Sequence, residues 1–206
     1  MITTTLRKLQ DAGLSDGLEA LFEHFGKSDP DDEPFPLGVI LEVLGLDYAF
    51  WACSVEAQYE KEWRLFAVWC ARRVEHLIDT QEDRHLLDQA ERYALGLIGE
   101  GDLHMAKVAA WGVANDYVKD PAKNAAWNAI WATILPQAWD AAMSTASDAA
   151  QAIAWEAYEA ASPETIDAVW DEAWDAERSA QAQEFLRIVT ETKEREKNDH
   201  YHFEEA

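Results

Sequence analysis

Clustered carboxylates on one predicted helix are the side chains that could bind a charged partner. The stretch DAVWDEAWDAE, residues 167–177, sets Trp170 and Trp174 one helical turn apart among five acids and no base. At about 100° per residue the two indoles share one face of the helix. A face about a quarter-turn away carries a row of acids, in which successive turns of the helix are separated by about 5.4 Å along its axis. The row consists of Glu164, Asp167, Asp171 and Asp175. Carboxylates in a row on a rigid helix imitate a phosphate backbone, which predicts contact with a basic protein surface.

The excess of acid extends beyond this helix. Between Lys123 and Arg178 there is no Lys or Arg, so the usual i,i+4 pairs of opposite charge are missing. The loop GKSDPDDEPFP adds four more acids within five residues. A solvated face that only keeps the chain soluble is the alternative interpretation. The candidate partner-binding residues are Glu164, Asp167, Asp171, Asp175, Glu172, Glu156, Glu159, Asp148, Asp29, Asp31, Asp32 and Glu33.

The balance of charge over the whole chain restricts its partners. The 206 residues carry a formal net charge of −23, whereas about 2–8 charges of either sign suffice for solubility. Nucleic acid and anionic membranes would be repelled, because both are bound through Lys and Arg. We therefore expect a basic nucleic-acid-binding protein as the partner, with no direct nucleic-acid or membrane contact. No apolar run approaches the ~20 residues of a membrane span, and we expect a cytoplasmic protein.

The sequence contains no recognised catalytic motif. HExxH, GxSxG, a Gly-rich phosphate loop and CxxC are all missing, so we expect neither an enzyme nor a cofactor. His200 and His202 with Glu204 could hold a metal, but we interpret them as a polar terminus and expect no metal site. The segment DPDDE lacks the Gly and the last Glu of an EF-hand loop. Cys53 and Cys70 lie in apolar stretches and are expected to be buried free thiols.

The elements that must position the acids are helices. Apolar residues recur at helical spacing over most of the chain, and no stretch alternates as a strand does. Thr80 is expected to cap one helix that ends at Gly99, and Asp120 followed by Pro121 to start another. The longer helices are expected over about 60–78, 80–99, 102–118, 121–136, 137–160 and 162–197. Shorter helices are expected over roughly 3–11, 15–25, 37–44 and 47–58.

These elements predict an all-α fold, a compact multi-helix bundle of about eight to ten helices. A short α-solenoid of helical hairpins is the alternative, although no period repeats along the chain. We divide the chain into a short-helix region (1–58) with an acidic loop (26–36), an Ala/Trp-rich bundle (59–197) and a polar tail (198–206). The ten tryptophans leave a homodimer open.

Three stretches resemble a group of Ala-rich helical proteins from phages and bacteria, some of them described as immunity proteins. They are RLFAVWCARRVEHLI, LDQAERYALGLIGEGDL and AAWGVA, and the resemblance covers roughly residues 47–190. It implies an all-α fold and an origin in a phage or mobile element, and it implies no catalytic residues. The chain departs from that group by placing Trp and acids where the group has Ala-Ala-Tyr.

The leading hypothesis is a non-enzymatic, phage-encoded inhibitor that mimics DNA or RNA. It would occupy a basic groove of a host defence or nucleic-acid enzyme, as anti-CRISPR and anti-restriction proteins do. The alternative is an immunity protein that neutralises a cognate toxin such as a basic nuclease, and the neighbouring genes would separate the two. A helical enzyme with an unrecognised site is the third hypothesis.

Overall fold

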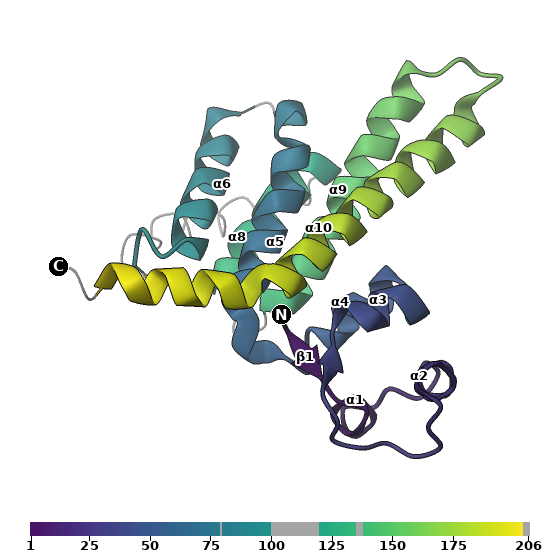
Figure 1. The fold of residues 1–206 in the computed structure, drawn as a ribbon. Coiled ribbons are helices and arrows are strands. Elements are labelled where there is room, and N and C mark those ends of the chain that lie inside the picture. Colours follow the sequence, from purple (N-terminus) through teal and green to yellow (C-terminus); the bar gives the residue numbers. More distant parts are fainter. Residues whose placement is uncertain (79, 100–119, 135–137, 204–206) are drawn as a thin grey trace. The chain divides into compact units, whose positions relative to one another are not determined.

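The computed structural model describes residues 1–78, 80–99, 120–134 and 138–203, with side chains for all of these except 82, 133, 134, 166 and 192–203. It is 74% helical, and the described residues form nine α-helices, which confirms the prediction of an all-α multi-helix bundle (Figure 1). The contacts divide the chain into a first unit, Met1–Gln58 with Ala182–Ala206, and a second unit, Tyr59–Gln181. The segment 182–197, which the sequence placed with the bundle, thus groups with the short helices.

The first unit contains a small antiparallel ladder that the sequence did not predict. Thr3 pairs with Pro36 and Thr4 with Phe35, and strands of two residues are too short to show alternation in a sequence. The elements of this unit are β1 (Thr3–Thr4), α1 (Leu6–Asp11), α2 (Leu18–Phe25), β2 (Phe35–Pro36), α3 (Gly38–Leu44), α4 (Leu46–Ala52) and the C-terminal part of α10 (Ile166–Phe203).

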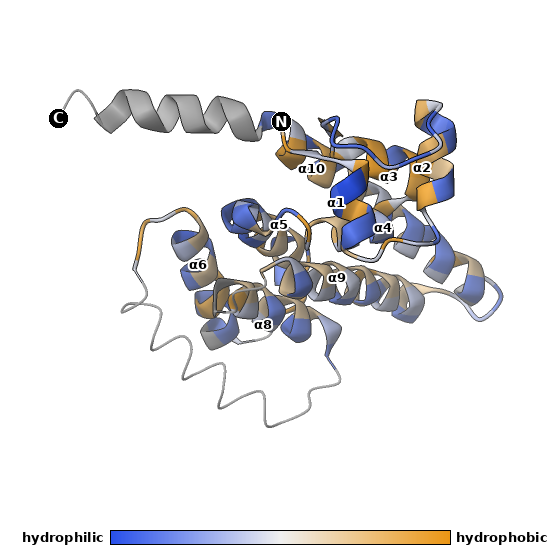
Figure 2. Cartoon of the chain, turned by 90° about the horizontal axis from the view of Figure 1, so that it is seen from below, coloured by the Kyte–Doolittle hydropathy of each residue, from blue (hydrophilic) through white to orange (hydrophobic). Residues whose placement is uncertain are grey.

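The short helices of the first unit enclose an apolar core of their own. Helices α1 and α2 each carry hydrophobic and hydrophilic residues (Figure 2), and Leu6, Leu9 and Leu21 are fully buried. The ring of Phe50 meets that of Phe185 edge to face at 5.8 Å. Ile2 N also donates to Val189 O at 2.6 Å. Contacts of both kinds fix the C-terminal part of α10 within this unit.

The second unit is a bundle of longer helices. The short 3-10 helix η1 (Ala57–Tyr59) ends at Tyr59, the first residue of the second unit. The elements of the second unit are α5 (Glu60–Arg73), the 3-10 helix η2 (Glu75–Leu77), α6 (Gln81–Ala94), α8 (Pro121–Ile134), α9 (Ala138–Ala160) and the start of α10. Two predicted caps are confirmed. The Thr80 hydroxyl accepts from Asp83 N at 3.1 Å, and Asp120 Oδ1 accepts from Ala122 N at 3.1 Å.

Two predicted helix ends were wrong. Helix α6 ends at Ala94 rather than Gly99, because Gly96 adopts a left-handed conformation (φ 74°) and Leu97 N bonds back to Arg92 O. Helix α10 begins at Ile166, because Ser162 to Thr165 form a turn that is closed by Thr165 N donating to Ser162 O at 3.0 Å. The helix predicted over 102–118 and the side chains of His200, His202 and Glu204 lie outside the described residues.

Alanine sets the close packing of this bundle. Helix α8 lies against α5, α6 and α9, and α5 also lies against α9. The buried residues of α8 and α9 are mostly alanines, and the buried Trp63 and Trp127 fill the space between helices. Helices α8 and α9 are antiparallel, since Asn128 Nδ2 donates to Asp148 Oδ2 at 2.7 Å while the start of α8 lies near residues 151–159 of α9. Small residues at the contacts let such helices approach closely.

Helices α9 and α10 form an antiparallel hairpin within the second unit, where they lie side by side (Figure 1). Near its turn, the rings of Trp155 and Trp170 meet edge to face at 6.1 Å. Further from the turn, Gln181 Nε2 donates to Ala146 O at 2.8 Å. Contacts at both levels fix the start of α10, and with it the predicted row of acids.

Candidate functional site

The start of α10 carries an exposed row of three aspartates, Asp167, Asp171 and Asp175, which we call the acidic row. Trp170 and Trp174 are half-buried beside it, so the indoles support the helix while the carboxylates face water. The tryptophans and the acids of the opening stretch therefore occupy different faces. Glu164 is exposed as well, but it lies in the turn before α10 and not on the helix. Glu172 is also exposed, but it follows Asp171 directly and is not part of the acidic row.

No cation neutralises the acidic row within the described part of the chain. None of its three carboxylates, nor those of Glu164 and Glu172, makes an ion pair with another described residue. Residues four apart rise about 6 Å along a helix, so successive charges of the row lie close enough to repel one another. Repulsion between the carboxylates of the acidic row therefore lowers the stability of the folded chain.

Glu177, two residues after Asp175 on α10, shows the opposite arrangement. Its side chain is almost fully buried, and both of its oxygens accept from Arg73 Nε, at 2.8 and 2.7 Å. Gln181 Nε2 donates to the same carboxylate at 3.2 Å. The hydrogen bonds to Glu177 raise the pKa of Arg73 above its ordinary value. Glu177 is therefore a structural residue that fixes α10 to α5.

The remaining arginines of α5 are also occupied inside the second unit. Arg72 bonds Glu75 at 2.9 Å and Asp88 at 2.7 Å, and it reaches Glu91 as well. Arg64 pairs with Glu60 and donates to the carbonyl of Ala132 at 3.0 Å. Arg64 and Arg72 thus serve α5, α6 and α8, and Arg73 reaches the hairpin only at the buried Glu177.

The acidic loop at residues 29–33 belongs to the first unit and is largely paired there. Lys27 Nζ lies 2.7 Å from Asp31 and 2.8 Å from Glu33, and Arg7 lies 3.3 Å from Asp32. The hydrogen bond from Lys27 lowers the pKa of Asp31. Asp29 accepts from the Ser28 hydroxyl at 3.0 Å. Because bases of its own unit neutralise most of this loop, it is a weaker candidate contact than the acidic row.

The three predicted acids of α9 divide into two kinds. Asp148 is half-buried against α8, where it accepts from Asn128, and burial raises the pKa of its carboxyl. It therefore faces a neighbouring helix. Glu156 and Glu159 are exposed near the end of α9.

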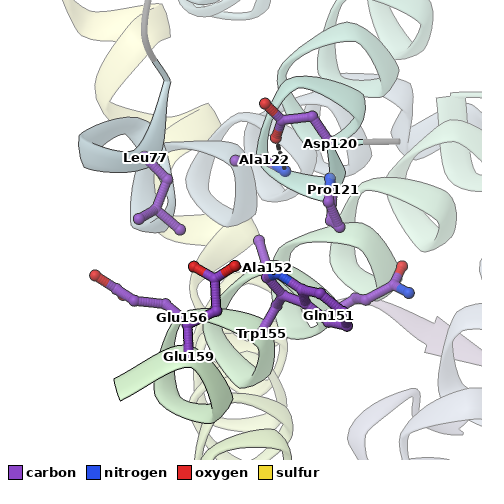
Figure 3. Close-up of a pocket in the computed structure, with 9 residues that line it drawn as sticks. All are labelled: Leu77, Asp120, Pro121, Ala122, Gln151, Ala152, Trp155, Glu156 and Glu159. Atoms are coloured by element: carbon purple, nitrogen blue, oxygen red, sulfur yellow. Dashed lines mark hydrogen bonds between the residues drawn. The ribbon is translucent and has the colours of Figure 1, made fainter. Parts of the chain in front are cut away.

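Glu156 and Glu159 line a pocket of about 540 Å³ in the second unit, which we call the Trp155 pocket. The other residues of its wall are Leu77, Asp120, Pro121, Ala122, Gln151, Ala152 and Trp155 (Figure 3). In Figure 3 the side chains of Glu156 and Glu159 lie together at the bottom of the pocket, below Leu77. The volume of the Trp155 pocket lies within the range of about 300–1,000 Å³ that ligand sites in proteins span.

Trp155 is an exposed aromatic residue of the described chain, and the sequence alone did not indicate its exposure. It is 49% exposed, although it stacks on Tyr158 at 5.4 Å and meets Trp170 edge to face. Its indole Nε1 donates to Glu159 Oε1 at 3.0 Å. These contacts hold the partly exposed ring in place at the wall of the pocket.

The sequence signal for this pocket is the length of α9. Helix α9 has 23 residues and α8 has 14, which correspond to about 34 and 21 Å. The face of α9 that carries Asp148 and Ala152 continues to Trp155 and Glu159, beyond the point where α8 starts. A change from alanine to glutamate and tryptophan on one face marks the position where the packing partner ends. Asp120, interpreted from the sequence only as a helix cap, also lines this space.

Comparison with protein-family models, with curated proteins and with solved structures found no match. The resemblance to Ala-rich phage and bacterial proteins therefore stays a prediction. Among the described helices, none is both long and apolar enough to cross a membrane. The described side chains contain no group of three or more His, Cys, Asp or Glu that could hold a metal ion.

Proposed function

We propose that the chain is a non-enzymatic inhibitor whose acidic row replaces a nucleic-acid strand in a basic groove of a partner protein. The observation that carries the proposal is the row itself. Three exposed carboxylates stand on one rigid helix, unpaired within the described residues, while the three arginines of α5 pair with other acids. Helix α10 is fixed behind them by Trp170, Glu177 and Gln181.

The spacing of the acidic row suits a mimic of a phosphate backbone. Successive carboxylates rise about 6 Å, and every second phosphate of one DNA strand rises about 6.8 Å. A basic groove that holds phosphates at this interval would therefore meet charges of the same sign at a similar interval. Long-range attraction would also speed the encounter, most strongly at low salt.

The alternative, an acidic face kept only for solubility, explains less. The net charge of −23 is well above the 2–8 charges that solubility needs. Opposite charges four residues apart would stabilise α10 by a few tenths of a kcal/mol each without harming solubility, and the helix lacks them here. A charge pattern that lowers stability is expected where a partner uses it.

The test compares two variants with the same change of charge. The first neutralises the acidic row (Asp167→Asn, Asp171→Asn, Asp175→Asn). The second neutralises three exposed acids of the first unit (Asp11→Asn, Glu19→Gln, Glu23→Gln). Immobilised wild-type chain and both variants are exposed to the same bacterial lysate, with and without a 20-base-pair competitor duplex, and bound proteins are identified by mass spectrometry.

The proposal expects one basic nucleic-acid-binding protein that the wild type and the second variant retain, that the first variant loses, and that the duplex releases. Equal retention by all three chains, or retention that the duplex does not change, would overturn it. The phage origin and a defence enzyme as the target rest on the resemblance and belong to the same proposal. So does a location in the host cytoplasm.

A further inference from the structure

We propose that the Trp155 pocket binds the guanidinium group of an arginine side chain that the partner protein presents. This inference rests on the proposed function for the source of the arginine. The chemistry of the pocket itself can be tested on the free chain. It also supplies what a row of exposed charges lacks, because such charges mainly raise the association rate, whereas tight binding needs buried anchors.

The pocket exists because α9 extends beyond its packing partner. Helix α8 starts at Pro121, so the last turns of α9 have no α8 opposite them, and Leu77 of η2 forms the wall on another side. Leu77, Pro121 and Ala152 give the pocket apolar walls (Figure 3). The aliphatic stem of an arginine can lie along such walls while its charged group reaches the polar end.

Trp155 provides a flat surface for a planar cation. Its ring lines the pocket at 49% exposure and is held by Tyr158, Trp170 and Glu159. A guanidinium stacks on an indole face, and tryptophan is the strongest of the aromatic partners in such contacts. Because the ring is already fixed, binding costs little side-chain entropy.

The charged groups of the pocket select a cation. Three carboxylates line it, and among the described residues no Lys or Arg does. Glu156 Oε2 lies 3.2 Å from His76 and Glu159 Oε1 accepts from Trp155, so the second oxygen of each carboxylate has no partner among the described residues. Two such oxygens suit the several fixed donors of a guanidinium better than the single charge of an ammonium group.

An anion is excluded by the state of the nearby helix end. The first N–H groups of α8 would attract an anion, but Asp120 Oδ1 already accepts from Ala122 N and Lys123 N, at 3.1 and 3.2 Å. Asp120 Oδ2 lies 3.5 Å from Lys123 Nζ. The positive end of α8 is thus capped within the chain, and the remaining carboxylates of the pocket meet the ligand.

The test follows the Trp155 indole resonance in ¹H–¹⁵N spectra, identified as the peak that Trp155→Phe removes. Three probes are titrated into the full chain at neutral pH: L-argininamide, L-citrullinamide, which is its uncharged counterpart, and L-lysinamide. We expect argininamide to shift the peak with saturation in the millimolar range, lysinamide to bind more weakly, and citrullinamide to leave the peak in place. Equal shifts with argininamide and citrullinamide, or no shift with either, would overturn the inference.

Variants then separate the pocket from the acidic row. Glu156→Gln and Glu159→Gln should each weaken argininamide binding roughly threefold to tenfold. Glu19→Gln, an equal change of charge at an exposed residue of the first unit, should leave it unchanged. Unchanged melting temperatures show that the variants fold, and unchanged binding in both pocket variants would contradict the inference.

A last comparison links the pocket to the partner. Glu156→Gln with Glu159→Gln should weaken capture of the protein that the acidic row retains. If capture stays at the wild-type level while argininamide binding is lost, the pocket serves a free cation and the assignment to a partner arginine is wrong. If argininamide binds but the acidic row retains no protein, the proposed function fails and the chemistry of the pocket stands.

Discussion

Neutralising the central residue of the acidic row should stabilise the chain at low salt. Asp171 has a like charge four residues away on each side, at Asp167 and Asp175, and no described cation nearby. Each such pair costs about 0.2–0.5 kcal/mol, and Coulomb's law in water at about 7 Å gives about 0.6 kcal/mol before screening. Asp171→Asn removes both pairs, and asparagine has nearly the same helix propensity as aspartate. We expect a gain of about 1 kcal/mol at 10 mM salt.

The assay is thermal unfolding followed by circular dichroism at 10 mM, 150 mM and 1 M NaCl. For a chain of this length a gain of 1 kcal/mol raises the melting temperature by about 2–4 °C. The gain should halve at 150 mM, where the Debye length is about 8 Å, and disappear at 1 M, where it is about 3 Å. A melting temperature that is unchanged or lower at 10 mM would refute the conclusion that the row is uncompensated.

Two further variants show whether the change in melting temperature depends on the surroundings of the aspartate that is replaced. Asp88→Asn makes the same chemical change at a residue paired with Arg72 at 2.7 Å, and it should lower the melting temperature. Asp167→Asn should gain less than Asp171→Asn. Asp167 has one neighbour in the row, and it lies in the first turn of α10, where the helix dipole favours a negative charge by about 0.3–1 kcal/mol. An equal gain from all three variants would indicate a general effect of net charge.

Three other predictions concern the supporting structure. Arg73→Met leaves Glu177 buried without its cation. Because Arg73 is itself 37% exposed, we expect the free energy of unfolding to fall by about 2 kcal/mol rather than the full value of about 3–5 kcal/mol, which lowers the melting temperature by about 4–8 °C. A fall below about 1 °C would be inconsistent with a structural ion pair. Burial raises the pKa of the Asp148 carboxyl in the folded chain, so the protonated form favours folding. This contribution to stability is lost as the pH rises through the raised pKa. Asp148→Asn should therefore exceed the wild type in urea midpoint at pH 7 and match it at pH 3, and equal midpoints at both would count against the assignment. Cys53 and Cys70 are buried and unbridged, and burial raises the pKa of the Cys53 thiol, so neither should react with Ellman's reagent until urea unfolds the chain.

Most of the helices could be predicted from the sequence because their signals are local. The caps at Thr80 and Asp120 and the glycine after α2 each set a boundary through neighbouring residues. The end of α6 was placed too late because Leu97 and Ile98 continue the apolar spacing after Gly96 has turned the chain. The grouping of residues 182–197 with the short helices depends on long-range contacts, such as that of Phe50 with Phe185, which no local pattern indicates.

The candidate site was predictable only where one helix determines it. Burial of Trp170 and Trp174 beside exposed aspartates follows from the register of α10 alone. The roles of Asp148, Glu156 and Glu159 depend on where α8 starts relative to α9, which is a property of two helices together. The pairing of the loop at residues 29–33 likewise depends on Arg7 and Lys27 approaching it in the fold. The number of charges was evident from the sequence, but which of them are neutralised was not.

Whether the acidic row replaces a nucleic-acid strand is tested by competition between the chain and nucleic acid for the partner that the row retains. Fluorescence anisotropy of a labelled duplex on the purified partner would be measured against increasing wild-type chain, the Asp167→Asn, Asp171→Asn, Asp175→Asn variant, and the Asp11→Asn, Glu19→Gln, Glu23→Gln control. We predict that the wild type and the control displace the duplex completely and with a steep dependence on salt, and that the acidic-row variant does not. Displacement by all three chains alike, or binding of chain and duplex to the partner at the same time, would contradict it.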